Sequence, residues 1–265
     1  MTEELIRIRQ ESGVATLTLN DPGAMNALSL EMTSALAQAL KALAKPEAGT
    51  RCLVITGEGR GFCAGANLKR RLTAEERDAM TGSLLELHYH PVFRLLRNFP
   101  APVATAVNGA AVGAGMSLAL MGDVILAARS AYFLQAFRNI GLVPDCGSSW
   151  LLPRIIGAAR ARELSLLGEK LAAETALDWG LINRVVDDAA LDEATAGIAE
   201  KIASGPVKAQ TAIRKLYWAS LHNGFEEQID LEDSYQTIAA MAPEAREGVA
   251  AFQEKRKADF RKVAG

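Results

Sequence analysis

Two glycine-rich segments decide the interpretation of this chain: Gly59-Arg-Gly-Phe-Cys-Ala-Gly-Ala-Asn67-Leu68 and Ala106-Val-Asn-Gly-Ala-Ala-Val-Gly-Ala-Gly115. Each segment includes or follows the end of an apolar run typical of a buried strand, and each is rich in residues too small to screen the backbone. Two such turns expose main-chain N–H groups, and two donors that converge on one oxygen form an oxyanion hole. Either turn alone is more typical of tight packing.

Strands and helices alternate around these segments. We predict strands over four apolar runs, at residues 14–19, 53–56, 103–107 and 124–127. A helix is predicted from Ser29 onward, and a second one over residues 83–97, interrupted near Pro91. Residues 108–115 are predicted as a turn before a helix that opens at Met116, and the charged segment 69–78 as a mobile loop. This alternation predicts an α/β protein with a buried sheet.

The last third of the chain is nearly all helix-forming, with breaks at Gly205-Pro206, at residues 222–224 and around Pro243. We therefore predict a core of residues 1–190 and a C-terminal helical region of residues 191–265. The region carries many large apolar side chains, namely Leu216, Tyr217, Trp218, Phe225, Ile229, Leu231, Tyr235, Ile238 and Phe252. On sequence alone, packing on another subunit and folding back on the same core are equally possible.

The composition excludes several classes of protein. With 49% hydrophobic and 23% charged residues and a net charge of −2, the 265-residue chain has no basic footprint for nucleic acid. The longest apolar stretch, residues 109–121, is too short to span a bilayer, and the first ten residues lack the apolar run of a secretory signal. Three cysteines without a paired framework favour a reducing compartment. We expect a cytoplasmic protein with neither nucleic acid nor membrane as a partner.

Several catalytic devices are missing from the sequence. The three histidines, His88, His90 and His222, belong to no metal-binding motif, so no metal is expected, and His88 and His90 are interpreted as structural or surface residues. No GxSxG nucleophile motif occurs. The glycines of residues 109–115 do not follow the GxGxxG order, and residues 133–135 lack the acidic ribose ligand of a dinucleotide site. No nicotinamide cofactor is expected.

Five segments in this order resemble the enoyl-CoA hydratase/isomerase family, also called the crotonase superfamily, over about residues 17–261. They are Leu19-Asn-Asp-Pro22 with Asn26-Ala-Leu28, Phe62-Cys-Ala-Gly-Ala66, Ala106-Val-Asn-Gly109, Gly141-Leu-Val-Pro-Asp145 and Arg246-Glu-Gly-Val-Ala-Ala-Phe-Gln-Glu-Lys-Arg256. The resemblance implies an α/β fold, a spiral of ββα units with a C-terminal helical trimerisation region. It also implies a homotrimer or dimer of trimers that binds an acyl-CoA thioester. Coenzyme A is then part of the substrate, and no separate cofactor is expected.

The resemblance also implies a set of binding residues. The N–H groups of Ala66 and Ala114 match the two oxyanion donors, which would stabilise the enolate formed when a thioester loses an α-proton. For the coenzyme A moiety the matching positions are Ala24, Ala27, Ala64, Asn67 and Leu68, together with Lys255 near a phosphate. A turn role for Asn67 and a solvated surface role for Lys255 are the alternatives.

The departures from the family pattern concern its acid and base. Hydratases of this family use two glutamates, and the matching positions here are Ser117 and Phe137. Hydration needs a base for water and an acid for carbon, so ordinary hydratase activity is not expected. Ser117 and Phe137 are expected to line the pocket, Phe137 as an apolar wall. Asp145 is the candidate base, which would move a proton from C2 to C4 of a 3-enoyl-CoA; capping the helix that begins at Ser148 is its alternative role.

Three further segments resemble one subgroup of the family. Residues 136–147, 150–154 and 230–235 resemble the phenylacetate-pathway isomerases, which rearrange a ring epoxide of phenylacetyl-CoA to an oxepin and also shift enoyl double bonds. Those relatives usually read AGQD where this chain reads Ala64-Gly-Ala-Asn67. We expect a 3-enoyl to 2-enoyl or an epoxyphenylacetyl-CoA isomerase. An enoyl-CoA hydratase and a non-catalytic acyl-CoA-binding subunit are the alternatives.

Overall fold

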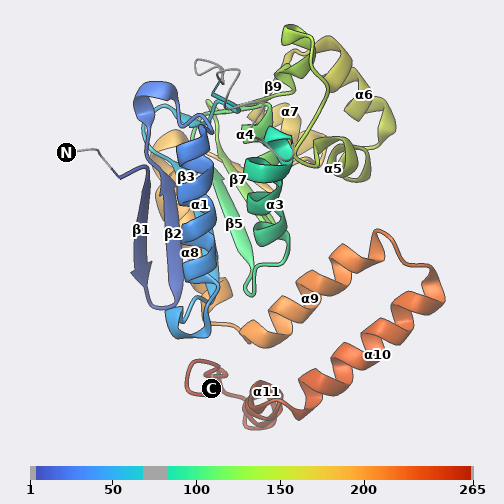
Figure 1. Ribbon diagram of the computed structural model, residues 1–265. Helices are drawn as coiled ribbons and strands as arrows, with labels where there is room; N and C mark the ends of the chain where they lie inside the picture. The colour runs from blue at the N-terminus through green and yellow to red at the C-terminus, as the bar shows by residue number, and fades with distance from the viewer. Residues whose placement is uncertain (1–3, 68–82, 264–265) are drawn as a thin grey trace.

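The computed structural model describes residues 4–67 and 83–263 and contains two sheets (Figure 1). The larger sheet has the strand order β1-β2-β3-β5-β7-β10. Its strands are β1 (Ile6–Glu11), β2 (Val14–Leu19), β3 (Cys52–Gly57), β5 (Val103–Val107), β7 (Val124–Ala128) and β10 (Arg184–Val186). All neighbouring strands are parallel except β1 and β2, which form an antiparallel pair. Strand β5 is buried along its whole length because it is a central strand of this sheet.

The smaller sheet has the strand order β4-β6-β8-β9. Its strands are β4 (Gly61–Cys63), β6 (Ala110–Val112), β8 (Tyr132–Leu134) and β9 (Lys170–Ala172). The first three are parallel to one another, and β9 is antiparallel to β8. Strands β3 and β4, β5 and β6, and β7 and β8 follow one another in the chain, one in each sheet. This repetition is the spiral of ββα units that the sequence resemblance predicts.

Helices cover the sheets and extend beyond them. In chain order they are α1 (Leu30–Leu43), the π-helical η3 (Leu85–Tyr89), α3 (His90–Arg97), α4 (Ala114–Ala119), α5 (Ser148–Ile155), α6 (Ala158–Leu167), α7 (Ala173–Asp178), α8 (Leu191–Ala203), α9 (Val207–Ser220), α10 (Phe225–Met241) and α11 (Pro243–Gln253). Short 3-10 turns are η1 (Pro22–Ala24), η2 (Pro46–Ala48), η4 (Ala136–Ile140) and η5 (Asp188–Ala190). Among the described helices, none is long and apolar enough to cross a membrane.

Local sequence explains the elements that were predicted. Helix α1 begins as expected after Ser29, whose hydroxyl accepts the Met32 N–H at 3.0 Å, and it buries an apolar stripe on the core. Strands β2, β3, β5 and β7 match the predicted runs, and the helical segment before Arg97 changes from π to α geometry next to Pro91. The predicted loop 69–78 lies outside the described residues.

The prediction of a turn over residues 108–115 is wrong in its middle. Residues 110–112 form strand β6, and helix α4 begins at Ala114 instead of Met116. The small residues there have low strand propensity, but pairing with β4 on one side and β8 on the other satisfies their backbone groups. Tertiary pairing therefore overrides the local composition.

The C-terminal helices divide into one that covers the sheet and three that project. Helix α8 lies in the predicted C-terminal region, but it packs on β3, β5 and β7, and the Arg51 guanidinium donates to the carbonyl oxygens of Ala203 (2.6 Å) and Gly205 (2.7 Å) at its end. Helices α9, α10 and α11 leave the core below the sheet (Figure 1). The projecting part therefore begins at Val207, after the predicted boundary between residues 190 and 191.

One buried arginine joins α9 to the core. The Arg214 guanidinium is paired with the Asp123 carboxylate at 2.7 Å and also donates to the carbonyl oxygens of Leu96 (2.6 Å) and Arg97 (2.6 Å) at the end of α3. Burial raises the pKa of Asp123, and the charge of Arg214 opposes this shift. The pair is therefore a buried ionic contact whose two members depend on each other.

Replacing this guanidinium should destabilise the protein strongly. Arg214→Ala leaves the Asp123 carboxylate and the α3 carbonyls without their donor, and we expect the free energy of unfolding to fall by about 3–5 kcal/mol. Urea unfolding at one fixed protein concentration measures the change. The control is Arg162→Ala on the exposed side of α6, with an expected change within about 0.5 kcal/mol. Equal unfolding midpoints for Arg214→Ala and the wild type would contradict the anchoring role.

Candidate active site

The two glycine-rich turns lie at the same edge of the smaller sheet. Strands β4, β6 and β8 are parallel and adjacent, so their carboxyl ends meet at one edge. Residues 64–67 follow β4, Gly113 and Ala114 follow β6, and η4 with Phe137 follows β8. Three segments that are far apart in the sequence are thus brought together by the register of three short strands.

The first two turns pack backbone against backbone. A Cβ atom on Gly65 would lie 2.6 Å from the Val112 carbonyl oxygen and 3.4 Å from the Ala114 nitrogen. A Cβ atom on Gly115 would lie 2.1 Å from the Cys63 carbonyl oxygen. Gly65 also has a φ of +85°, which side chains rarely tolerate. Glycine is therefore required at both positions for the two turns to touch.

The N–H groups of Ala66 and Ala114 have no acceptor among residues 4–67 and 83–263. Leu28 forms an isolated parallel bridge to Ala66, in which the Leu28 N–H donates to Gly65 (2.7 Å) and the Asn67 N–H donates to Leu28 (3.2 Å). The Ala66 N–H takes no part in the hydrogen bonds of this bridge. Ala114 is the first residue of α4, where N–H groups lack intrahelical acceptors. Both turns therefore supply unused main-chain donors at one place.

Two asparagine side chains hold the turn that precedes β4. The Asn26 amide donates to the carbonyl oxygens of Gly61 (2.7 Å) and Glu58 (3.0 Å), and the Asn108 amide donates to that of Gly59 (2.8 Å). Asn26 is fully buried with a φ of 56°. Both asparagines belong to the sequence segments that carry the family resemblance, but their bracing role was not predicted from the sequence.

The residues predicted to bind coenzyme A fall into two groups. Segment 24–28 lies along segment 64–67, since the Ala64 N–H donates to Met25 (2.9 Å) beside the Leu28–Ala66 bridge, and this brings Ala24, Ala27, Ala64 and Asn67 together. Leu68 lies outside the described residues. Lys255 follows α11 at the opposite end of the molecule, where the C-terminal segment contacts the β1–β2 turn through a hydrogen bond from Arg261 to the Ser12 carbonyl oxygen (2.9 Å). Within one chain, Lys255 is not brought to the turns.

Asp145 lies between η4 and α5, next to α4. The Ser117 hydroxyl donates to the main-chain oxygen of Asp145 (3.3 Å), which places this loop against the first turn of α4. The Asp145 Oδ1 atom is buried, and no hydrogen-bond partner for it is found in the described part of the chain. The N-cap of α5 is Gly147, and the Ser148 N–H donates to the main-chain oxygen of Asp145 (3.0 Å), not to its carboxylate. These contacts contradict the helix-capping interpretation.

Burial raises the pKa of Asp145 above its ordinary value, while a hydrogen bond with the Cys146 side chain and the charge of His90 oppose the shift. Burial also raises the pKa of the Cys63 thiol to about 12 and that of the Cys146 thiol further. Both thiols are therefore neutral at physiological pH and unsuited to nucleophilic catalysis.

Tyr89 is a polar residue of the site that was not identified from the sequence. Its hydroxyl donates to the Leu28 carbonyl oxygen (2.8 Å), and burial, with Cys146 and Asp145 as nearby contributors, raises its pKa to about 12. It lies in η3, where only its position two residues before Pro91 stood out in the sequence. The neutral phenol braces the segment that bridges to Ala66.

Ser117 and Phe137, which were predicted to line the substrate pocket, lie beside the second turn and are both buried. The Ser117 hydroxyl donates to the Gly113 carbonyl oxygen (3.4 Å) and is fully buried. A Cβ atom on Gly113 would lie 3.7 Å from the end of the Phe137 ring, which is itself buried. The structure thus brings Ala114, Ser117, Phe137 and Asp145 together and gives the site one apolar and one acidic side.

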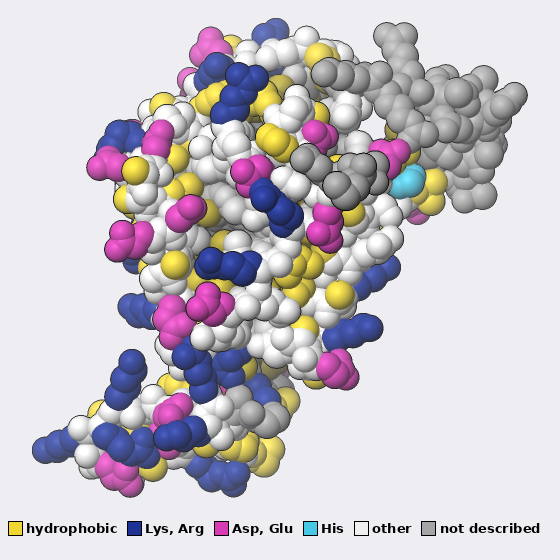
Figure 2. Space-filling view, turned by 90° about the vertical axis from the view of Figure 1, so that its left-hand side faces the viewer, with side chains coloured by type: hydrophobic (Ala, Val, Ile, Leu, Met, Phe, Trp, Pro, Cys, Tyr) yellow, Lys and Arg dark blue, Asp and Glu magenta, His cyan; other side chains and the backbone are white. Residues whose placement is uncertain are grey.

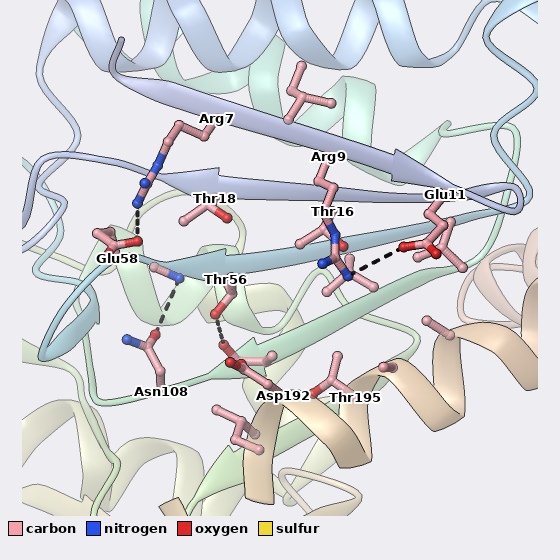
Figure 3. Close-up of a pocket in the computed structure, with 18 of the residues that line it drawn as sticks. Arg7, Arg9, Glu11, Thr16, Thr18, Thr56, Glu58, Asn108, Asp192 and Thr195 are labelled. Carbon is pink, nitrogen blue, oxygen red and sulfur yellow. Dashed lines mark hydrogen bonds and ion pairs between the residues drawn. The ribbon is translucent and has the colours of Figure 1, made fainter. Parts of the chain in front are cut away.

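Two hollows lie near these elements. An apolar pocket of about 270 Å³ begins beside Asp145, where Cys146 and His90 line it. A polar groove of about 1010 Å³ opens on the other face of the larger sheet, between β1, β2, β3 and α8 (Figure 3). In it Arg7 pairs with Glu58, and the Thr56 hydroxyl donates to Ala106 (2.9 Å). None of the predicted site residues that the structure describes lines either hollow, but Cys146, the residue after Asp145, lines the pocket. We therefore assign the pocket, and not the groove, to the candidate site.

The described residues contain no preformed metal-binding site. Among residues 4–67 and 83–263, no group of three or more His, Cys, Asp or Glu side chains is arranged to hold a metal ion. Asp145 is accompanied by thiols, a phenol and one imidazole. The arrangement can polarise a carbonyl oxygen and move a proton.

The chain matches known proteins along nearly its whole length. A family model described as enoyl-CoA hydratase/isomerase matches residues 9–263. The 1,2-epoxyphenylacetyl-CoA isomerase of Escherichia coli (strain K12) is 45% identical over 97% of this chain and 98% of the relative. A probable enoyl-CoA hydratase of Rhodobacter capsulatus is 42% identical, over 98% and 99% of the two chains.

Solved structures agree with the sequence comparison. The crystal structure of an enoyl-CoA hydratase of Mycobacterium smegmatis superposes with a TM-score of 0.88 at 33% identity, covering 98% of this chain and all of the other. A similar structure from Mycobacterium abscessus gives a TM-score of 0.87 at 34% identity, covering 96% of this chain and 98% of the other. The crotonase-like fold expected from the sequence is therefore confirmed, and the chain belongs to the enoyl-CoA hydratase/isomerase family.

Proposed function

We propose that this protein isomerises acyl-CoA thioesters by shifting a double bond through an enolate. The supporting observation is the Asp145 carboxylate, which has a buried, unpartnered oxygen and a raised pKa beside two turns with unused N–H groups. The positions at which hydratases of the family carry glutamates hold Ser117 and Phe137 instead. One carboxylate is enough to move a proton between two carbon atoms, whereas hydration normally uses two.

The N–H groups of Ala66 and Ala114 act in this proposal as the oxyanion hole. A thioester oxygen placed between them gains negative charge as the α-proton leaves, and preorganised donors stabilise that charge without further rearrangement. Loss of one such donor in comparable sites costs about 2.7–4 kcal/mol of transition-state stabilisation. The contacts of Gly65 and Gly115 support this role because they hold the two donors at one edge of the sheet.

Asp145 acts as the base and then as the acid. It takes a proton from C2 of a 3-enoyl-CoA, the electron pair moves into the dienolate, and the same proton returns at C4 to give the 2-enoyl-CoA. No water enters and no redox change occurs. The raised pKa increases the basicity of the carboxylate, which favours removal of a carbon-bound proton. The resemblance to an epoxyphenylacetyl-CoA isomerase supports rearrangement of a ring epoxide at this site as a related activity.

Assembly completes the proposed site. The projecting helices expose large apolar side chains, including Tyr217 (75% exposed), Phe225 (76%) and Phe252 (86%), which one chain does not cover. Figure 2 shows hydrophobic side chains and many lysines and arginines in a lobe below the core. We infer a homotrimer, alone or paired with a second trimer. In such an assembly Lys255 contacts the coenzyme A phosphate in the site of a neighbouring copy, because its own site is at the far end.

Asp145→Asn should abolish isomerisation. The amide cannot accept the C2 proton, and we expect kcat for 3-hexenoyl-CoA to fall about 10²–10⁴-fold. The absorbance of the conjugated 2-enoyl thioester reports the reaction, and titration with hexanoyl-CoA reports binding, which should stay nearly unchanged.

Folding of the variant serves as the control. Because burial raises the pKa of Asp145 in the folded state, its charge lowers stability as pH rises through this raised pKa, and Asp145→Asn should be at least as stable as the wild type at pH 7. Isomerase activity retained in a folded Asp145→Asn protein would remove Asp145 from the mechanism.

The pH profile should reveal the same carboxylate. The active form is the ionised one, so kcat/KM falls on the acid side as Asp145 takes up a proton. Its midpoint should lie above the ordinary aspartate pKa of about 3.9, because burial raises the pKa. Initial rates in overlapping buffers give the profile, with circular dichroism at each pH to exclude unfolding. A midpoint at or below the ordinary value would show that burial does not control the base.

A substrate panel separates isomerase, hydratase and binding protein. We expect 3-hexenoyl-CoA to be converted, while crotonyl-CoA is hydrated well below the ordinary enzyme rate of about 10 s⁻¹. In D₂O the oxyanion hole and Asp145 should exchange α-protons of the bound ester. Hydration at or above that rate would support the hydratase, a function suggested by the name of the Rhodobacter relative. Binding without isomerisation or exchange would support a non-catalytic subunit.

A further inference from the structure

The apolar pocket next to Asp145 is built from the core and from the C-terminal region. Its volume is about 270 Å³, and helices α3, α5 and α9 contribute most of its lining residues. Among them are Phe93 from α3, Trp150 and Leu151 from α5, and Trp218 from α9, with His222 just after α9. Helix α9 therefore closes a pocket whose other walls belong to the core.

The pocket lies where the distal part of a bound acyl group would arrive. Cys146 and Gly147 line it and directly follow Asp145, the proposed base. Met121, which lies two residues beyond the end of α4, the helix that begins at Ala114, also lines it. An acyl chain whose thioester oxygen meets the Ala114 N–H and whose reacting carbons lie near Asp145 extends from there into this pocket.

Stacked rings fix the wall of the pocket at the α5–α9 contact. The Trp150 and Trp218 rings are nearly parallel, with centroids 5.7 Å apart and an interplanar angle of 8°, and His222 stacks on Trp150 at 5.1 Å. The Arg154 guanidinium lies 4.2 Å from the centre of the Trp150 ring, and that of Arg97 lies 5.4 Å from the Trp218 ring. Cation–π contacts thus hold both indoles in place, and the wall cannot easily move to admit a larger group.

We propose that Trp150 and Trp218 are specificity-determining residues, which select acyl groups whose distal part is an uncharged, apolar, ring-sized group. The inference rests on the proposed acyl-CoA function and specifies its substrate class. The volume supports this size, since an apolar cavity of about 150 Å³ already takes up benzene, and 270 Å³ leaves room for one ring with its linking carbons. No carboxylate of the described residues lines the pocket; Arg94 and Arg97 line it together with apolar and aromatic side chains.

Binding of unreactive thioesters tests the pocket separately from catalysis. Dissociation constants are measured by calorimetry for acetyl-CoA, phenylacetyl-CoA and 2-naphthylacetyl-CoA with the full-length protein. In the wild type, we expect phenylacetyl-CoA to bind about tenfold more tightly than acetyl-CoA, as burial of a phenyl-sized group implies. The two-ring ester should bind more weakly than phenylacetyl-CoA because the stacked wall excludes it.

Trp218→Leu removes the α9 side of the wall and should bring the phenylacetyl to acetyl preference down to about threefold or less. Trp218→Phe keeps an aromatic side chain in the wall and should retain most of the preference for phenylacetyl-CoA over acetyl-CoA. Trp179→Leu is the matched control, because Trp179 is also a half-buried tryptophan with an arginine over its ring at 5.1 Å, but it lines no part of this pocket. It should leave the preference unchanged. Thermal melting identifies variants that fail to fold.

The outcomes distinguish the pocket from the reaction. A wild type without preference for the ring ester, or a folded Trp218→Leu protein with the full preference, would overturn the assignment of the pocket. The expected binding pattern without double-bond isomerisation would support the pocket and contradict the proposed reaction. Absence of binding by every CoA ester would overturn both.

Discussion

The contact between two backbone turns is the constraint on which the site depends. Val112 and Cys63 present carbonyl oxygens at distances that admit Gly65 and Gly115 but no Cβ atom. Strands β4 and β6 bring the turns to the same edge, and the Asn26 and Asn108 amides hold the preceding loop by its carbonyl groups. Much of the scaffold thus serves to hold the turns that carry the N–H groups of Ala66 and Ala114, the two donors of the proposed oxyanion hole.

Burial of the Asp145 carboxylate lowers the stability of the folded protein and also raises the pKa that the proposed proton transfer uses. A buried carboxylate oxygen without a hydrogen-bond partner costs on the order of 1–3 kcal/mol, and burial raises the pKa of the group. The main-chain oxygen of Asp145, in contrast, accepts from Ser117 and Ser148, so the loop is held by the backbone while Oδ1 of the side chain has no hydrogen-bond partner in the described part of the chain. Neutral neighbours, the Tyr89 phenol and the Cys63 thiol, do not compete for the proton. Such an arrangement is typical of a functional group.

The sequence predicted what local chemistry determines. Ser29 marks the start of α1 because serine is a preferred helix N-cap, and the apolar run 103–107 is strand β5 because a strand buried on both faces has a continuous apolar sequence. Strand β6 has no such signature: alanines 110 and 111 extend only because β4 and β8 lie on either side. The site residues were likewise predicted only through the family resemblance. The unpartnered Oδ1 of Asp145 and the hydrogen bond from Tyr89 to Leu28 could not be predicted, because they depend on contacts between segments that are distant in the sequence.

Helix α9 links the site to the surface through two adjacent stripes of side chains. Arg214, Trp218 and His222 are spaced by four residues: the buried Arg214 anchors α9 to the core, and Trp218 lines the pocket together with His222, which lies just beyond the end of α9. Ile213, Tyr217 and Leu221 follow the same spacing one position earlier, and all three are exposed. In the proposed assembly, a neighbouring copy that packs on the second stripe contacts a helix whose first stripe contributes to the pocket wall. The proposed assembly and the proposed acyl selectivity therefore depend on the same helix.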